Sequence, residues 1–224
     1  AAMQTLPQLK AHVAAALRAG ASPLQVRETI YQCAPYIGFP KTLNAIDIAN
    51  GVFEASGISL PLENAGTVDA TDPSAREQAG AAIQAPLYGN EVKEVFSALP
   101  KPFDEFVPHL LTSSAFGDFA TRGGLDVAQR ELISLVAIAA IGATTQLRPH
   151  VAGAIRAGSS RQKVAAALVQ VMPYIGGPYA LSGLVLVARY DEVKREQDVM
   201  DFGDLLRDEG LRPDAGALVP WSRW

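Results

Sequence analysis

The sequence predicts an all-α protein made of two copies of one helical unit. When His12 is set against His150, the segment QLKAHVAAALRAGAS aligns without a gap with QLRPHVAGAIRAGSS. The same alignment places PYIGFP of the first copy on PYIGGP of the second. Apolar residues recur with helical spacing in both copies. One repetition at this long separation indicates duplication and fusion of a whole small domain, which gives a covalent pseudo-dimer.

The helices of the first copy have recognisable start signals. Ser22 and Gln25 form a possible capping box for a helix over residues 24–34, and Pro40 suits the first position of a helix over residues 41–55. The second copy repeats these signals at the matching positions, for helices over residues 160–172 and 179–198. We interpret PYIGFP and PYIGGP as the breaks between the helices of each copy.

A further helix precedes the matching segment in the second copy. Asp126 and Gln129 have capping-box spacing at the start of residues 126–142, and this helix should be almost fully buried after its first turn. The first copy begins opposite Ala139 in the sequence as given. We therefore expect the first copy to lack the counterpart of this leading helix.

These signals divide the chain into four parts. We expect a first, N-terminally incomplete repeat over residues 1–56, a linker over 57–88, a second repeat over 89–200 and a C-terminal arm over 201–224. The linker contains SGISLPLENAGTVDATDPSA, which is rich in turn-forming residues and shows no sustained periodicity. The arm carries two prolines and two tryptophans, so we expect it to lie over a partner or over the other half.

Composition excludes several function classes. Of 224 residues 49% are hydrophobic and 19% are charged, which is sufficient for a buried core. A net charge of −4 without a run of Lys or Arg argues against nucleic-acid binding. The longest apolar stretch, Leu132 to Ile141, is too short to cross a bilayer. We expect no nucleic-acid or membrane partner and a cytoplasmic location.

Cys33 is the single cysteine of the chain. One thiol excludes an intramolecular disulfide, a CxxC pair and a thiolate cluster for zinc. Its counterpart in the second copy is Val171, which favours a packing role over a chemical one.

The second copy resembles a known family at a series of positions. These are Leu125, Asp126, Arg130, Glu131, Leu132, Gln146, Leu147, His150, Val151, Gly158, Tyr174, Gly176 and Pro178. They are similar to the carboxymuconolactone decarboxylase family, which includes alkylhydroperoxidase D. The resemblance covers residues 117–189 in full and 1–54 without the leading helix. The resemblance implies a fold of two alkylhydroperoxidase D-like helical domains in tandem. It also implies a homotrimer, in which three fused double domains take the place of the six single domains of a hexamer.

The resemblance also bears on the type of chemistry. Its redox branch uses a CxxC pair at the start of the histidine-bearing helix, and those positions hold Ala143 and Gln146 here. Thiol peroxidase chemistry needs a thiolate nucleophile, so this site does not offer it. The remaining pair, Glu131 and His150, favours the decarboxylase side of the family.

An acid–base pair suits a decarboxylase that needs no cofactor and no metal. Loss of carbon dioxide from a carboxylated lactone, a product of aromatic ring cleavage, leaves an enolate-like anion that must be protonated on carbon. We expect His150 to act as the general acid and Glu131 as its orienting partner. We expect four further residues to bind this small carboxylate substrate: Arg122, Arg148, Tyr174 and Gln146. His12 and Tyr36 would form the second copy of the site.

Two other functions stay open. Glu131 also suits the first turns of a helix as a complement to its dipole, and His150 at the margin of an apolar face suits a structural role. The protein would then be a catalytically silent member that forms oligomers or binds a ligand. A peroxide-handling protein is the third alternative, which the absent cysteine pair disfavours.

Overall fold

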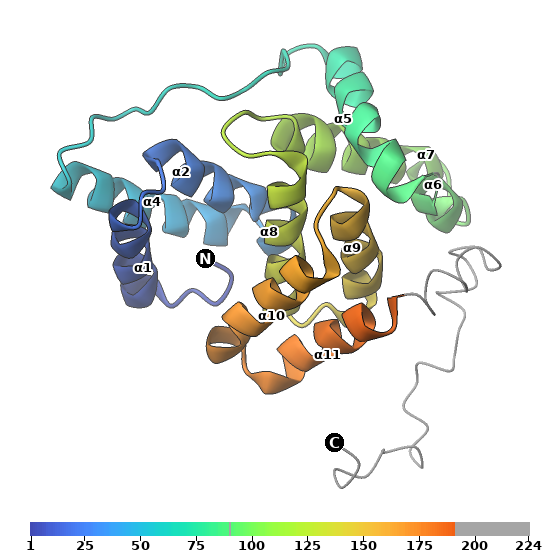
Figure 1. The fold of residues 1–224 in the computed structure, drawn as a ribbon. Coiled ribbons are helices and arrows are strands. Elements are labelled where there is room, and N and C mark those ends of the chain that lie inside the picture. Colours follow the sequence, from blue (N-terminus) through green and yellow to red (C-terminus); the bar gives the residue numbers. More distant parts are fainter. Residues whose placement is uncertain (90, 191–224) are drawn as a thin grey trace, which may run out of the picture.

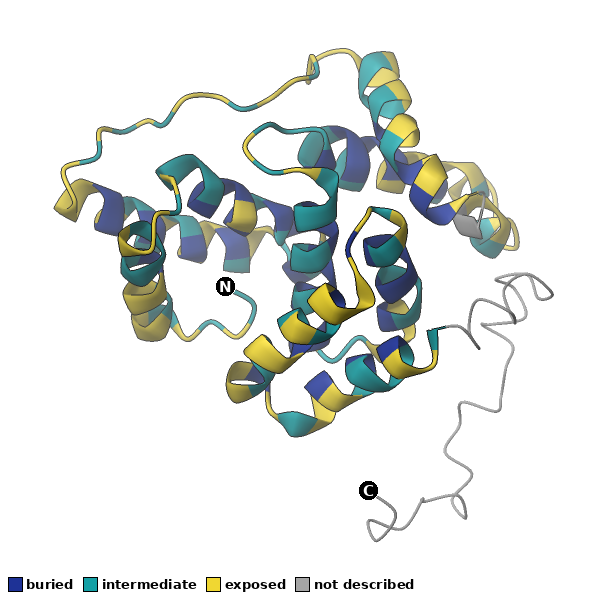
Figure 2. Ribbon diagram, in the orientation of Figure 1, coloured by how far each residue is buried: buried dark blue, intermediate teal, exposed yellow. Residues whose placement is uncertain are grey.

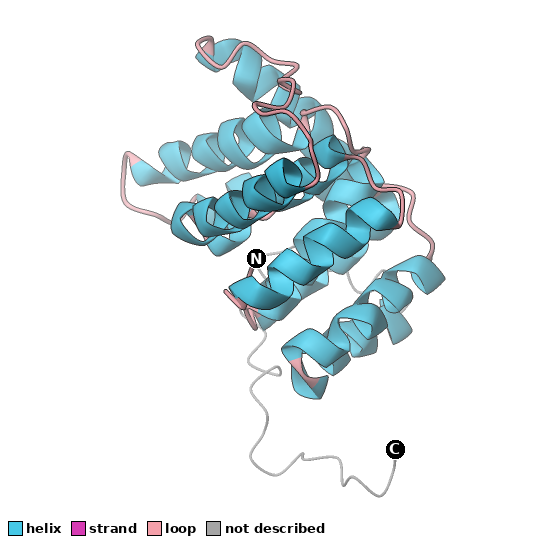
Figure 3. Ribbon diagram, turned by 90° about the vertical axis from the view of Figure 1, so that its left-hand side faces the viewer, coloured by secondary structure: helices cyan, strands magenta, loops and turns pink. Residues whose placement is uncertain are grey.

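The computed structural model describes residues 1–89 and 91–190, and every regular element within them is a helix (Figures 1 and 3). The first repeat contains α1 (Leu6–Arg18), α2 (Pro23–Gln32), α3 (Ala34–Ile37) and α4 (Phe39–Ala55). Next come α5 (Pro73–Tyr88), α6 (Glu91–Phe96), α7 (Phe103–Leu110) and the π-helix η1 (Leu111–Ala120). The second repeat contains α8 (Val127–Ala140), α9 (Thr144–Arg156), α10 (Arg161–Ile175) and α11 (Gly177–Ala188). The expected C-terminal arm, with Trp221 and Trp224, lies outside the described residues.

The helices confirm a tandem duplicated domain. In the alignment of His12 with His150, α1 and α9 begin and end at matching residues, and the starts of α2 and α10 and of α4 and α11 also coincide. The two copies turn at equivalent glycines, Gly38 with φ 83° and Gly176 with φ 86°. These glycines mark the breaks, and the helix before each continues through the PYI residues that we had placed in the break.

The predicted capping boxes of α2 and α8 are both present. The Ser22 hydroxyl accepts from the backbone N–H of Gln25, whose side chain accepts from the N–H of Ser22. Asp126 and Gln129 make the same reciprocal pair at the start of α8. The local sequence therefore defines where these two helices begin.

The segment expected to be a linker is half helical. Residues 57–72 form the irregular connection, and α5 begins at Pro73 with Asp72 as its N-cap. Helix α5 packs directly on η1, because Gly80 and Gly117 let the two backbones approach; an added Cβ at Gly80 would lie 2.2 Å from a carbonyl oxygen of η1. This packing fixes the position of the C-terminal end of α5.

Helix α8 lies at the centre of the molecule, between the two repeats (Figure 1). It contacts α2 and α3 of the first repeat and α9, α10 and α11 of the second. Buried residues make up most of its length (Figure 2). As a consequence, the side chains of neighbouring residues in α8 contact different helices. Arg130 points to the first repeat, and Glu131 points to α9. Among the helices of the described residues, none is both long and apolar enough to cross a membrane.

A buried ion cluster joins the two repeats at Glu28, whose side chain has no solvent exposure. Its carboxylate accepts hydrogen bonds from Arg27 of the same helix, from Arg122 at 2.8 Å and from Arg130 at 3.4 Å. Burial by itself would raise the pKa of Glu28, but the bonds from Arg122 and Arg27 and the charge of Arg130 hold it below its ordinary value. The carboxylate therefore stays ionised in the interior.

We expect Glu28→Gln to lower the free energy of unfolding at pH 7 by about 3 kcal/mol, because three guanidinium groups then lose their buried counter-charge. Since the folded pKa is depressed, the stabilisation from Glu28 is present above the ordinary glutamate pKa and disappears as the pH falls through the folded value. Urea denaturation at a series of pH values measures both effects. Glu54→Gln, an exposed change on α4, is the control. Equal stability of wild type and Glu28→Gln at pH 7 would contradict the assignment.

Candidate active site

Three polar side chains from three helices meet beside α8. Tyr88 ends α5, Glu131 lies in α8 and His150 in α9. The Tyr88 hydroxyl lies 2.5 Å from Oε2 of Glu131 and 2.8 Å from Nδ1 of His150. Glu131 is 3% exposed and Tyr88 is 6% exposed, whereas the His150 side chain keeps 13%. The three residues form one hydrogen-bonded chain, with the imidazole at its accessible end.

The direction of the hydrogen bonds fixes the roles of the imidazole nitrogens. A phenol has one hydrogen, and here it is donated to Glu131. The phenol oxygen then accepts from Nδ1–H of His150. Nε2 of His150 makes no hydrogen bond within the described residues. The direct separation of His150 Nδ1 and Glu131 Oε2 is 3.5 Å, and the Tyr88 hydroxyl links the two side chains.

Both tyrosines around the imidazole stay protonated near neutral pH. The rings of Tyr36 and Tyr88 contact the His150 ring edge-on, with centroid distances of 5.4 Å and 5.3 Å. Burial, followed by the negative charge of Glu131, raises the pKa of each phenol. Arg156 donates to the carbonyl oxygen of Leu87 at 2.7 Å and so holds the end of α5 in place.

The two copies exchange their tyrosines. Tyr36 of the first copy contacts His150 of the second, and Tyr174 of the second copy contacts His12 of the first at 5.2 Å between ring centroids. We had grouped Tyr174 with His150 and Tyr36 with His12, which is wrong for both contacts. The reason is the pseudo-twofold packing, which places the PYIG turn of each copy against the histidine helix of the other.

Arg122, which we expected to bind the substrate, is engaged elsewhere. The Arg122 guanidinium contacts Glu28 and the ring of Tyr31 in the first repeat. Gln146 is exposed in the first turn of α9, and Arg148 is half-buried two residues further along. The structure thus brings together Glu131 and His150, places beside them Tyr36, which we had assigned to the other copy of the site, and adds Tyr88.

The counterpart of the site in the first copy has a different character. His12 borders a hollow of about 560 Å³, which is lined mainly by apolar residues of α1, α2, α8 and α10. Within residues 1–89 and 91–190, no carboxylate pairs with His12. The hydrogen-bonded chain around His150 therefore has no equivalent at His12 in the part of the chain that the structure describes.

Tyr88 was missed by the sequence analysis because it lies outside the repeat and in the expected linker. One signal for it was present. Gly153 stands in the middle of α9 where the first copy has Ala15, and an internal helical glycine often marks a close approach. An added Cβ at Gly153 would lie 2.4 Å from the Tyr88 hydroxyl oxygen and 3.0 Å from Oε2 of Glu131.

Cys33 lines the hollow at His12, and its thiol donates to the carbonyl oxygen of Thr29 at 3.3 Å. Burial raises the pKa of the Cys33 thiol from its ordinary 9.0 to about 11. The thiolate needed for redox or metal chemistry is therefore scarce at neutral pH. No group of three or more potential metal-binding side chains occurs among the described residues.

Comparison with known proteins shows the family of this chain. A model of the carboxymuconolactone decarboxylase family matches residues 1–51 and 107–189, more than half of the chain. A nitrosuccinic acid decarboxylase from Metarhizium robertsii is 28% identical over 130 residues, which cover 58% of this chain and 87% of that protein. Glu131, His150 and Tyr36 lie within the ranges matched by the family model, whereas Tyr88 lies between them.

We expect Gly153→Ala to lower the free energy of unfolding by about 1–3 kcal/mol, because the new methyl group displaces the Tyr88 hydroxyl. Gly51→Ala is a matched control: Gly51 also lies inside a helix, but a Cβ there meets nothing within 4 Å. It should stabilise the protein by up to about 1 kcal/mol, the usual difference between the two residues in a helix. Thermal and urea unfolding measure both variants. If both substitutions changed the free energy of unfolding in the same direction, a close approach at Gly153 would be ruled out.

Thiol alkylation tests the environment of Cys33. At pH 8 iodoacetamide should modify Cys33 about 100-fold more slowly than a short cysteine peptide, because a thiol with a pKa of about 11 holds that much less thiolate. The rate should rise as the pH approaches 11. The urea-unfolded chain, in which the thiol is solvated, should react at the peptide rate. If Cys33 in the folded protein reacted at the peptide rate, its thiol would be available for redox chemistry and this assignment would be wrong.

Proposed function

Because the chain belongs to the carboxymuconolactone decarboxylase family, we propose that it is a cofactor-free decarboxylase of a small carboxylated ring-cleavage product, such as a carboxymuconolactone-like acid. The family match and the decarboxylase relative support decarboxylase-type chemistry. The observation that carries the proposal is the hydrogen-bonded chain from Glu131 through Tyr88 to His150. It ends on an imidazole nitrogen that is free to meet a substrate.

The reaction needs one heterolytic cleavage and one proton transfer. The bond between the carboxylate carbon and the neighbouring carbon breaks, and carbon dioxide leaves without the bonding electrons. The electron pair stays on the substrate carbon and is delocalised into an adjacent carbonyl group of the lactone. Nε2 of the His150 imidazolium then donates a proton to that carbon, and His150 returns to its charged form by taking a proton from water.

Glu131 and Tyr88 serve as positioning residues in this scheme. The chain keeps the proton of His150 on Nδ1, which directs the acidic proton of the charged ring to Nε2. The Glu131 carboxylate lies 3.5 Å from Nδ1 of His150 and is linked to it through the Tyr88 hydroxyl. Tyr36 closes one side of the ring and limits the directions from which a substrate can approach.

The named relative supports the substrate class at the level of bond chemistry. Nitrosuccinic acid carries a carboxylate on a carbon that also bears a nitro group, and this group accepts an electron pair as a lactone carbonyl does. The shared requirement is a carboxylate beside an electron-withdrawing group. We therefore propose this class for the present chain, with carboxylated lactones and nitro acids as the first compounds to assay.

Two other proposals have less support. A peroxide-handling role is disfavoured because Ala143 and Gln146 occupy the positions of the cysteine pair. A silent, ligand-binding role suits the first copy better than the second, because His12 has no carboxylate partner in the described residues. We also propose the homotrimer of fused double domains that the resemblance implies, which sedimentation equilibrium would test.

We expect His150→Ala to lower kcat for carbon dioxide release by about 100-fold or more, the usual contribution of a positioned general acid. His12→Ala is the matched control, because it removes the equivalent residue of the other copy and should leave kcat unchanged. Glu131→Gln and Tyr88→Phe should each lower kcat, because the His150 ring loses the hydrogen-bonded chain that orients it. Full activity of a folded His150→Ala protein would exclude the proposed site.

A further inference from the structure

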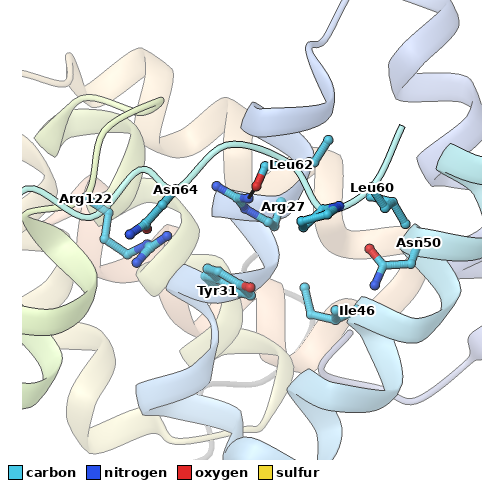
Figure 4. Close-up of a pocket in the computed structure, with 9 residues that line it drawn as sticks. Arg27, Tyr31, Ile46, Asn50, Leu60, Leu62, Asn64 and Arg122 are labelled. Atoms are coloured by element: carbon cyan, nitrogen blue, oxygen red, sulfur yellow. Dashed lines mark hydrogen bonds between the residues drawn. The ribbon is translucent and has the colours of Figure 1, made fainter. Parts of the chain in front are cut away.

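A second hollow lies away from the Glu131–His150 chain, between the first repeat and residues 60–64 (Figure 4). Its volume is about 550 Å³, within the range of small-molecule sites. Arg27 and Tyr31 of α2 and Ile46 and Asn50 of α4 line it, together with the connecting segment and Arg122. None of these residues contacts the active-site chain.

Positive charge is in excess at one end of this hollow. Arg27, Arg122 and Arg130 all contact Glu28, and no other carboxylate pairs with them in the described residues. One carboxylate therefore faces three guanidinium groups. Arg130 is 1% exposed and takes no part in the lining, whereas Arg27 and Arg122 both border the hollow. An anion in the hollow would be attracted by the positive potential of these guanidinium groups, which Glu28 neutralises only in part.

The cationic groups are held in place before any ligand arrives. The guanidinium carbons of Arg27 and Arg122 lie 5.5 Å and 5.1 Å from the centroid of the same ring, Tyr31. Arg27 also donates to the carbonyl oxygens of Leu62 and Glu63. These contacts fix the connecting segment as one wall and reduce the entropy that binding would cost.

Several donors in the hollow have no partner within the described residues. Arg122 uses Nε and Nη2 for Glu28, and its Nη1 makes no hydrogen bond. The amide nitrogens of Asn50 and Asn64 make none either, although Oδ1 of Asn64 accepts from Gly66. The Asn64 amide lies beside Arg122, whereas Asn50 lies at the other end of the hollow, beside Ile46 and Leu60 (Figure 4). Unused donors beside excess positive charge are the features of an oxyanion site.

The rest of the lining is apolar. Ile46, Leu60, Pro61 and Leu62 form the wall beside the arginine end. An inorganic ion would leave this surface without a contact, whereas an organic anion would cover it. We propose that the hollow binds a small organic carboxylate, with the carboxylate on Arg122 and its apolar body against Ile46, Leu60 and Leu62. The site is additional to the proposed catalytic one and does not depend on it.

Calorimetric titration of the full chain with benzoate at low ionic strength tests the proposal. We expect saturable binding with one site per chain that persists in His150→Ala. Arg122→Gln should weaken the affinity at least ten-fold, because it removes the charge and the unused donor. Arg18→Gln is the matched control, since it removes an exposed arginine on α1 and should leave the affinity unchanged.

A second variant covers the case in which Arg122→Gln unfolds through the loss of a partner for Glu28. Asn50→Trp fills the hollow from α4 without changing the arginines, and it should abolish benzoate binding in a folded protein. Inorganic phosphate should bind at least ten-fold more weakly than benzoate, because it has no apolar body. Absence of saturable benzoate binding, unchanged binding in Asn50→Trp, loss of binding in His150→Ala, or phosphate affinity equal to that of benzoate would overturn the proposal.

Discussion

The structure depends on one buried carboxylate that three guanidinium groups share. Glu28 belongs to the first repeat, whereas Arg122 and Arg130 belong to the loop before α8 and to α8 itself. An uncompensated charge of this kind would cost several kcal/mol in the interior, so the partners must stay together. This requirement fixes the rotation of α8 against α2. With Arg130 directed to the first repeat, the next residue, Glu131, is directed to α9 and Tyr88.

The duplication produces symmetric contacts but not symmetric sites. Each histidine receives its aromatic neighbour from the other copy, so neither half could supply that contact alone. Glu131 and Tyr88 break the symmetry. The first comes from a helix whose counterpart is not among the described residues, and the second from α5, which lies outside the repeat. Among the described residues the hydrogen-bonded chain is therefore built at His150 and not at His12, although the helices around the two histidines match.

The buried polar groups of this protein serve two different purposes. At His150 a carboxylate, a phenol and an imidazole satisfy one another and leave one nitrogen accessible. Around Glu28 three guanidinium groups contact one carboxylate, so positive charge is in excess. Two of these arginines, Arg27 and Arg122, border an open hollow. Because unpaired charge is costly in the interior, the surplus lies at the surface end of the cluster, where water or a ligand anion can meet it.

The helical class, the duplication and the two capping boxes follow from the sequence through local spacing and the comparison of the copies, which act within a helix or between aligned positions. The pairing of Glu131 with His150 came from the resemblance to the family. Only the packing of the helices reveals three further contacts: the exchanged ring contacts of Tyr36 and Tyr174, the hydrogen bonds of Tyr88 and the ion pair of Arg122 with Glu28. All three join segments that are distant in the sequence. Such contacts produce no periodic pattern of residues, so the sequence does not predict them. Gly153 was a local sign of the Tyr88 contact, because a side chain there would occupy the space of the Tyr88 hydroxyl.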